Sequence, residues 1–146
     1  MITSQGRFYI DKKDVMQGKN LIEKYKVLIS KVTAEHAGEP DKEGKFKVLS
    51  RTEVVEPGVV CTDSYIIIGS FSNREEAMNL YSYLTTRFVR FMLLMAVSSI
   101  NLSKEKFQFI PLQDFSHPWT DEMLYEKYGL DKDEIAFIES MIRPME

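Results

Sequence analysis

Two segments in the first third of the chain show the apolar and polar alternation that β-strands produce. Residues 6–10 (GRFYI) are predicted to form a short strand, and residues 25–32 (YKVLISKV) a longer strand that is buried on at least one side. Between them, residues 11–18 indicate a turn or a single helical turn, and residues 20–24 indicate another short helix. We expect residues 25–32 to be the central strand of a sheet.

Two further strands are predicted beyond a charged loop. Residues 34–44 combine Gly, Pro and charged residues without periodicity, so we expect a loop there rather than a linker between domains. Residues 45–55 and 59–71 then have strand patterns, and the Pro57-Gly58 pair between them signals a turn. Loops of this length on a rigid scaffold tend to carry function, which makes residues 34–44 a candidate binding element.

A long helix is predicted over residues 73–99, which contain neither Gly nor Pro. Ser72 and Glu75 have the spacing of a capping box at its start. Apolar side chains recur every three or four positions and are expected to face the core: Ala77, Leu80, Tyr81, Leu84, Phe88, Phe91, Met92 and Met95. The helix is apolar all round beyond Phe91, so we expect that half to be buried against the sheet or a partner.

The C-terminal part is predicted to be mostly helical. Residues 107–112 have an extended pattern that ends at a proline. Two short helices follow, at residues 120–128 with Gly129 past the end, and at residues 132–142 with Asp131 as the N-cap. Together the elements predict an α+β fold with a small mixed β-sheet, one long helix and two short C-terminal helices.

The composition favours one soluble domain over residues 1–146. Of the 146 residues, 44% are apolar and 28% are charged, and no apolar run approaches the ~18–20 residues of a membrane span. The single cysteine and the lack of a signal-peptide pattern at the N-terminus lead us to expect a cytoplasmic protein. We expect a core at about residues 6–112 and an acidic helical segment at residues 113–146.

Charge is distributed unevenly along the chain. Residues 1–110 hold 16 basic and 13 acidic residues, a net charge of +3, whereas residues 111–146 hold 3 basic and 9 acidic residues, a net charge of −6. A chain that is acidic in total can therefore present a basic face to a polyanion. Solvated surface charge without a partner is the alternative interpretation.

Common catalytic and cofactor motifs do not occur in the sequence. It contains no GxGxxG, no GxxxxGK[ST], no HExxH and no CxxC, and its two histidines, His36 and His117, are predicted to lie in separate loops. Asp41, Glu43 and Lys45 superficially resemble the PD...(D/E)xK pattern of metal-dependent nucleases. In that mechanism the carboxylates come from two strands and converge on one Mg²⁺, whereas here they share five residues of one loop. We therefore predict no catalytic and no metal-binding residues.

Basic side chains suggest an anion-binding surface instead. Tyr83, Arg87 and Arg90 are predicted to share one face of the long helix, where two guanidinium groups and a ring could hold phosphates or a base edge. Ion pairing around the core is the alternative. A second basic group flanks the 34–44 loop and could line one edge of the domain: Lys31, Lys45, Lys47 and Arg51.

Several segments resemble one protein family, notably EPG, CTDSYIIIGSF and FIPLQDFSHPWTDEMLYEKYGLDKDEIAFIESMIRPM. From about Gly6 to its end the chain is similar to the C-terminal part of bacterial restriction-modification proteins. These are the adenine-specific DNA methyltransferases and fused type IIG restriction endonucleases that have a TaqI-like catalytic domain. The order of strand, loop, strand and long helix is also similar to the recognition domains of type I specificity subunits.

The resemblance implies a target recognition domain, which reads double-stranded DNA while a separate catalytic domain transfers methyl from S-adenosylmethionine. The catalytic signature, Asn-Pro-Pro-Tyr or Asp-Pro-Pro-Tyr, is absent here. S-adenosylmethionine, and Mg²⁺ for cleavage, are therefore expected for the parent enzyme and not for this chain. The expected partners are DNA and the catalytic domain or subunit. The candidate DNA-binding residues are Lys31, His36, Lys45, Lys47, Arg51, Thr62, Ser64, Tyr83, Arg87 and Arg90.

Two other functions stay open from the sequence. One is a fragment of a metal-dependent restriction endonuclease or methyltransferase that retains a catalytic role. The other is a protein interaction domain, in which the apolar segment 92–97 and the acidic tail dock on a catalytic subunit.

Overall fold

The computed structural model describes residues 1–32, 40–96 and 104–145. Its centre is a three-stranded sheet in the order β4-β3-β5, formed by β3 (Tyr25–Ser30), β4 (Thr52–Val55) and β5 (Tyr65–Phe71). The prediction of a central strand is confirmed, because β3 pairs with both neighbours. Both pairings are antiparallel, so the prediction of a mixed sheet is wrong in this detail. The α+β class is confirmed.

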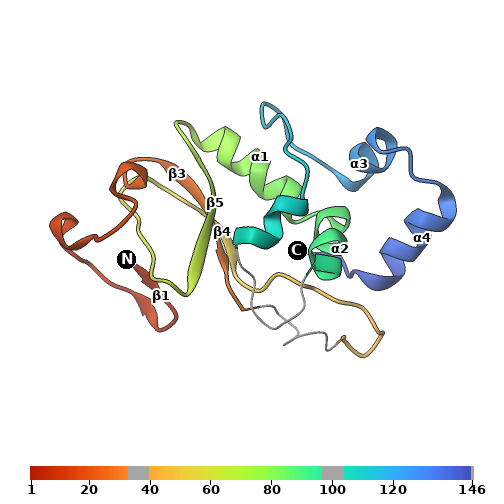
Figure 1. Cartoon of the computed structure of the whole chain (residues 1–146), viewed down its shortest axis with the longest axis horizontal. Helices are drawn as coiled ribbons and strands as arrows, with labels where there is room; N and C mark the ends of the chain where they lie inside the picture. Colours follow the sequence, from red (N-terminus) through yellow and green to blue (C-terminus); the bar gives the residue numbers. More distant parts are fainter. Residues whose placement is uncertain (33–39, 97–103, 146) are drawn as a thin grey trace.

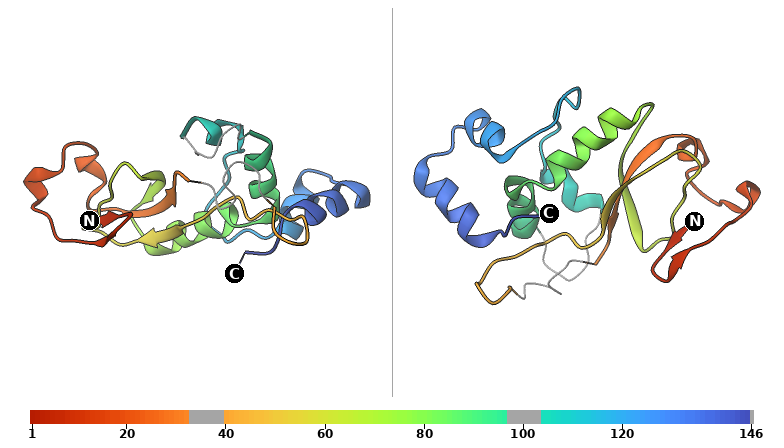
Figure 2. Two further views of the ribbon diagram at one scale, coloured as in Figure 1. Left: turned by 90° about the horizontal axis from the view of Figure 1, so that it is seen from below. Right: turned by 180° about the vertical axis from the view of Figure 1, so that it is seen from behind.

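The sheet separates two apolar clusters, because successive side chains of β3 point to opposite faces. Val27 and Ile29 belong to the main core, which the helices cover. Leu28 belongs to a smaller cluster with Ile2 and Tyr65 on the other face. Figures 1 and 2 show this arrangement, with the N-terminal strands on one side of the sheet and the helices on the other.

Short elements form the N-terminal layer. The hairpin of β1 (Ile2–Thr3) and β2 (Gly6–Arg7) is followed by the 3-10 helices η1 (Lys12–Asp14) and η2 (Lys19–Leu21). The strand predicted at residues 6–10 is therefore limited to two residues. Lys26 fixes this layer to β3: its buried ammonium donates to the carbonyls of Leu21, Ile22 and Lys24.

The predicted long helix is two helices, α1 (Arg74–Leu84) and α2 (Arg87–Ala96), and residues 97–99 lie outside the described part. The two threonines between them account for the break, because their hydroxyls compete for helix hydrogen bonds. Thr86 Oγ1 donates to the Tyr83 carbonyl at 2.7 Å and accepts from the Val89 N–H at 3.2 Å. At the start of α1 the N-cap is Asn73, one residue after the predicted Ser72.

The two C-terminal helices are confirmed as α3 (Asp121–Lys127) and α4 (Lys132–Met141). Thr120 caps α3, and Asp131 and Glu134 form a capping box on α4. The extended segment predicted at residues 107–112 is wrong in its first half, where the 3-10 helix η3 (Lys104–Phe109) lies. Leu124 and Ile138 join the main core with residues of α1 and α2, so the acidic segment packs on the same core as the sheet.

Residues 45–51 were predicted to be part of a strand, but β4 begins only at Thr52. Val48 has a φ of 69°, in the left-handed region that a β-branched residue rarely adopts, so a regular strand cannot pass through it. Phe46 instead pairs with the C-terminal segment, and its carbonyl accepts a hydrogen bond from the Arg143 N–H.

In the described part of the chain, no helix has the length and apolar character needed to cross a membrane.

Candidate functional site

Four of the predicted site residues lie together at one end of the central sheet, where β3 ends and β4 and β5 begin. The Ser30 N–H donates to the Arg51 carbonyl at 2.8 Å, and the Lys31 N–H donates to the Ser64 carbonyl at 3.0 Å. Thr62 lies two residues before Ser64, and its carbonyl accepts a hydrogen bond from the Tyr65 N–H. We call this group the sheet-end site: Lys31, Arg51, Thr62 and Ser64.

The guanidinium of Arg51 is held in a fixed direction. Its Nε donates to Glu53 Oε2 at 2.9 Å, its Nη1 donates to the Tyr65 hydroxyl at 3.0 Å, and it lies 5.5 Å from the centre of the Tyr65 ring. The hydrogen bond with Glu53 is the largest cause that raises the pKa of Arg51. A guanidinium that is oriented beforehand loses less entropy when it binds a planar anion or a base edge.

Glu53 also binds a second arginine. Its Oε1 accepts from Arg7 Nη2 at 2.8 Å, so one carboxylate is shared by two guanidinium groups. With Lys31, which forms no ion pair in the described part of the chain, and with Asp63, the sheet end carries three basic and two acidic side chains. The local field is therefore weakly positive and can attract a polyanion.

Lys45 and Lys47 lie in the segment that pairs with the C-terminus. The Lys45 N–H donates to Asp41 Oδ1 at 2.9 Å, and the Lys47 carbonyl accepts from Arg90 Nη1 at 3.3 Å. The Asp41 carboxylate also accepts hydrogen bonds from the Glu43 N–H and from Arg143 Nη1. The hydrogen bond from the Lys45 N–H is the largest cause that lowers the pKa of Asp41. This carboxylate therefore supports the geometry of its own turn. His36 lies outside the described residues.

The helix face predicted to hold an anion through Tyr83, Arg87 and Arg90 is not formed, because two of its three members are buried. Tyr83 and Arg90 are each 1% exposed. The Tyr83 hydroxyl donates to the Pro111 carbonyl at 2.7 Å. Arg87 is partly exposed and faces the acidic helix α4, with Nη1 3.5 Å from Glu139 Oε1.

Arg90 joins three chain segments inside the main core. Its Nε donates to two carbonyls at the helix break and its Nη1 to two carbonyls further away: those of Thr85, Thr86, Lys47 and Arg143. α1 ends at Leu84 and α2 begins at Arg87, so the face predicted for one continuous helix is interrupted between Tyr83 and Arg90. Arg90 is therefore structural.

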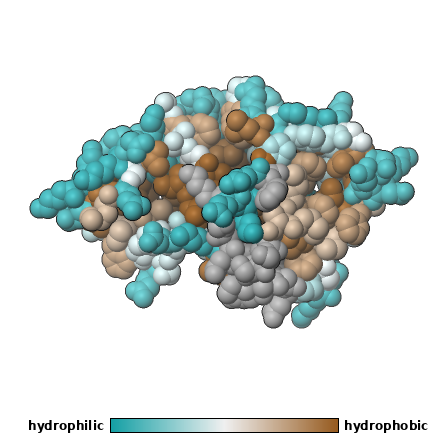
Figure 3. Space-filling view, in the orientation of Figure 1, coloured by the Kyte–Doolittle hydropathy of each residue, from teal (hydrophilic) through white to brown (hydrophobic). Residues whose placement is uncertain are grey.

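An apolar cavity lies between β5, α1 and residues 107–115. Its volume is about 330 Å³, and Leu80, Phe107 and Phe115 are among its lining residues. The polar atom of Tyr83, which also lines it, already bonds Pro111. Figure 3 shows apolar residues gathered over the middle of this face, between polar ends. The described residues that line the cavity include no combination of side chains for acid, base or nucleophilic chemistry.

The sequence interpretation did not select Glu53, Tyr65 or Arg7 for the site. Glu53 could have been found, because residues two apart on a strand share a face and Arg51 lies two positions earlier. Arg7 reaches the site only through the N-terminal hairpin, which no local pattern indicates. Within the described ranges, no three or more His, Cys, Asp or Glu side chains are grouped so that they could hold a metal ion.

Comparison of the chain with protein-family models, with curated proteins and with solved structures gives no significant match.

Proposed function

We propose that this chain is a sequence-specific DNA recognition module of a restriction-modification enzyme, and that catalysis belongs to another domain or subunit. The observation that carries the proposal is the sheet-end site, where Lys31, the fixed Arg51 and the polar residues Thr62 and Ser64 lie at adjoining strand ends. Guanidinium groups, ammonium groups and hydroxyls are the side chains that contact phosphates and base edges in DNA complexes. The resemblance to restriction-modification proteins supports the same function.

The weak local charge fits a module that provides only part of a DNA clamp. Two of the three cations at the sheet end share Glu53, so few of them are free to neutralise phosphates. Affinity in the range of non-specific binding, on the order of 10⁻⁴ to 10⁻⁶ M at physiological salt, is expected for the isolated chain. In this proposal the catalytic partner supplies the remaining contacts and binds S-adenosylmethionine and any Mg²⁺, in the cytoplasm.

Fluorescence anisotropy with a labelled duplex of mixed sequence tests the proposal. Lys31→Ala and Arg51→Ala should each weaken binding. If the residue contacts a phosphate, the slope of log K against log salt should fall by about one. Arg74→Ala is a matched control, because Arg74 also pairs with a glutamate at 2.8 Å but lies beyond the opposite end of β5. No binding by the wild type at low salt, or equal losses in all three variants, would contradict the proposal.

A further inference from the structure

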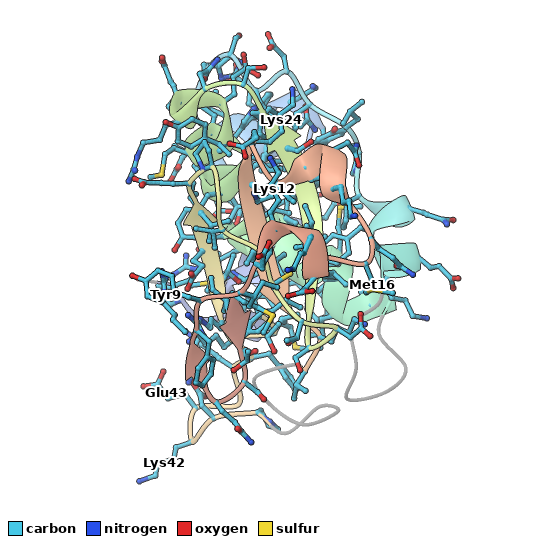
Figure 4. The ribbon with its side chains drawn as sticks, turned by 90° about the vertical axis from the view of Figure 1, so that its left-hand side faces the viewer. Tyr9, Lys12, Met16, Lys24, Lys42 and Glu43 are labelled. Carbon is cyan, nitrogen blue, oxygen red and sulfur yellow. The ribbon has the colours of Figure 1, made fainter. Side chains whose placement is uncertain are left out.

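A segment with exposed apolar residues, residues 8–16, follows the N-terminal hairpin, and we call it the arm. Tyr9 is fully exposed, Met16 is 89% exposed and Phe8 is 53% exposed. Local contacts order the arm: the Phe8 N–H donates to the Met1 carbonyl at 2.8 Å, which extends the pairing of the hairpin, and Asp11 caps η1 through the Lys13 N–H. Figure 4 shows Tyr9 and Met16 at the same end of the molecule as Lys12 and Lys24.

The charges around the arm favour an anionic partner. Residues 7–24 hold five basic and three acidic residues, whereas residues 111–146 hold three basic and nine acidic residues. Lys12 and Lys13 pair with exposed carboxylates, which are weak interactions in solvent. Lys19 and Lys24 form no ion pair in the part of the chain that the structure describes. Apolar residues are thus exposed at the end of the molecule where cations are in excess.

The arm adjoins the sheet-end site through a cleft of about 430 Å³. Ile10 and Met16 line one part of this cleft, and Thr62 and Asp63 line another. Asp14 also lines it, so the cleft contains two carboxylates and would repel phosphate. Carboxylates do accept hydrogen bonds from the amino groups of bases. A ligand that reaches both the arm and the sheet-end site would therefore place bases, rather than phosphates, against the arm.

We propose that Tyr9 is a base-stacking residue, which packs its ring on a nucleobase of the DNA that is bound at the sheet-end site. This inference rests on the proposed function and adds a second mode of contact to it. Aromatic side chains stack on bases of any sequence, and inserted apolar side chains can part a base step in duplex DNA. Lys12 and Lys24 lie at the same end of the molecule, apart from the Tyr9 ring, and would hold phosphates that flank the stacked base.

The test is the anisotropy of a labelled mixed-sequence duplex over a series of salt concentrations, with three substitutions of Tyr9. Tyr9→Ala should weaken binding about fivefold or more, because one stacked base is lost. The slope of log K against log salt should stay unchanged, because no phosphate contact is removed. Tyr9→Phe should bind like the wild type, and Tyr9→Leu should bind like Tyr9→Ala. Phe137→Ala removes an exposed ring from the acidic helix α4 and should have no effect.

The outcomes separate this inference from the proposed function. If the wild type does not bind DNA at all, the proposed function fails and the stacking role fails with it. If the wild type binds and Tyr9→Ala binds equally well, only the stacking role is overturned, and the arm becomes a candidate surface for a protein partner. Equal binding by Tyr9→Leu and Tyr9→Phe, or a changed salt slope in Tyr9→Ala, would also overturn stacking. Thermal melting of each variant ensures that folded proteins are compared.

Discussion

Asp121 caps a helix to which it does not belong: its Oδ1 accepts the N–H of Phe88 at 2.9 Å, although the two residues are 33 positions apart. Its Oδ2 accepts the N–H of Arg87 at 3.2 Å, so one carboxylate satisfies two of the free donors at the start of α2. Because Asp121 is the first residue of α3, this contact fixes α3 to the point where the predicted long helix breaks. The break is thus stabilised by a residue that is remote in sequence.

Replacement of Asp121 should therefore destabilise the fold. Asp121→Ala is expected to lower the free energy of unfolding by about 1–2 kcal/mol, which is the usual effect of losing a carboxylate cap at a helix N-terminus. Urea unfolding followed by circular dichroism measures it. Glu122→Ala is the control, because Glu122 is an exposed neighbour in the same turn. A loss of equal size in both variants would show that Asp121 acts only through the charge of α3.

Arg90 and Arg87 should differ in their effects on stability, although the sequence suggests equivalent roles for them. Arg90→Met removes, within the described part of the chain, four hydrogen bonds to buried or partly buried carbonyls and should cost about 3 kcal/mol or more. Arg87→Met removes one partly exposed ion pair and should cost about 0–1 kcal/mol. Thermal melts check both losses of stability, and DNA binding is compared per folded molecule. Unchanged stability of Arg90→Met would mean that the buried guanidinium is not structural.

Sequence periodicity predicts best the elements whose burial and capping follow from their own residues. β3 has apolar residues on both faces, α3 lies within the helix predicted at residues 120–128, and α4 has the predicted N-cap Asp131. The helix break at Thr85 and Thr86 was missed, because it depends on Asp121 and on hydroxyl bonds rather than on Gly or Pro. The end of the predicted strand before Thr52 depends on pairing with the C-terminus, which no local pattern contains.

The candidate site shows the same limit. Lys31, Arg51 and Ser64 could be grouped from sequence, because antiparallel neighbours bring the ends of successive strands together. Arg90 could not be assigned correctly, because its burial follows from carbonyls contributed by Lys47 and Arg143. Tyr9 lies in the strand predicted at residues 6–10, but β2 ends at Arg7 and the Tyr9 side chain is fully exposed.

Gly69 should tolerate no side chain while Leu80 keeps its present position. A Cβ at Gly69 would lie 2.6 Å from Leu80 Cδ2, so Gly69→Ala forces this core side chain of α1 to move. We expect a loss of about 1–3 kcal/mol, as is typical of an overpacked core. Ser70→Ala, at the exposed next position, should have little effect. In Gly69→Ala, the further change Leu80→Val should restore part of the stability, and denaturant unfolding of the double variant checks this coupling.

Two buried tyrosines should respond in opposite directions to loss of the hydroxyl. The hydroxyl of Tyr125 is buried and has no hydrogen-bond partner in the described part of the chain, whereas that of Tyr83 donates to the Pro111 carbonyl at 2.7 Å. Tyr125→Phe should therefore raise the free energy of unfolding by about 1 kcal/mol, and Tyr83→Phe should lower it by about 1 kcal/mol. Denaturant unfolding at neutral pH measures both changes. A loss in both variants would show that Tyr125 has a partner in solution.

Alkaline pH gives Tyr125 a second test. Burial is the largest cause that raises the pKa of Tyr125 above its usual value of 10.0, and the carboxylates of Asp121 and Glu139 add to the shift. The folded state then keeps the phenolic proton where the unfolded state releases it, so stability is complete below pH 10 and falls as the pH rises further. Tyr125→Phe removes this titration, so its stability advantage over the wild type should widen above pH 10. A constant difference across that range would contradict the prediction, because it would mean that the Tyr125 hydroxyl titrates alike in the folded and unfolded states.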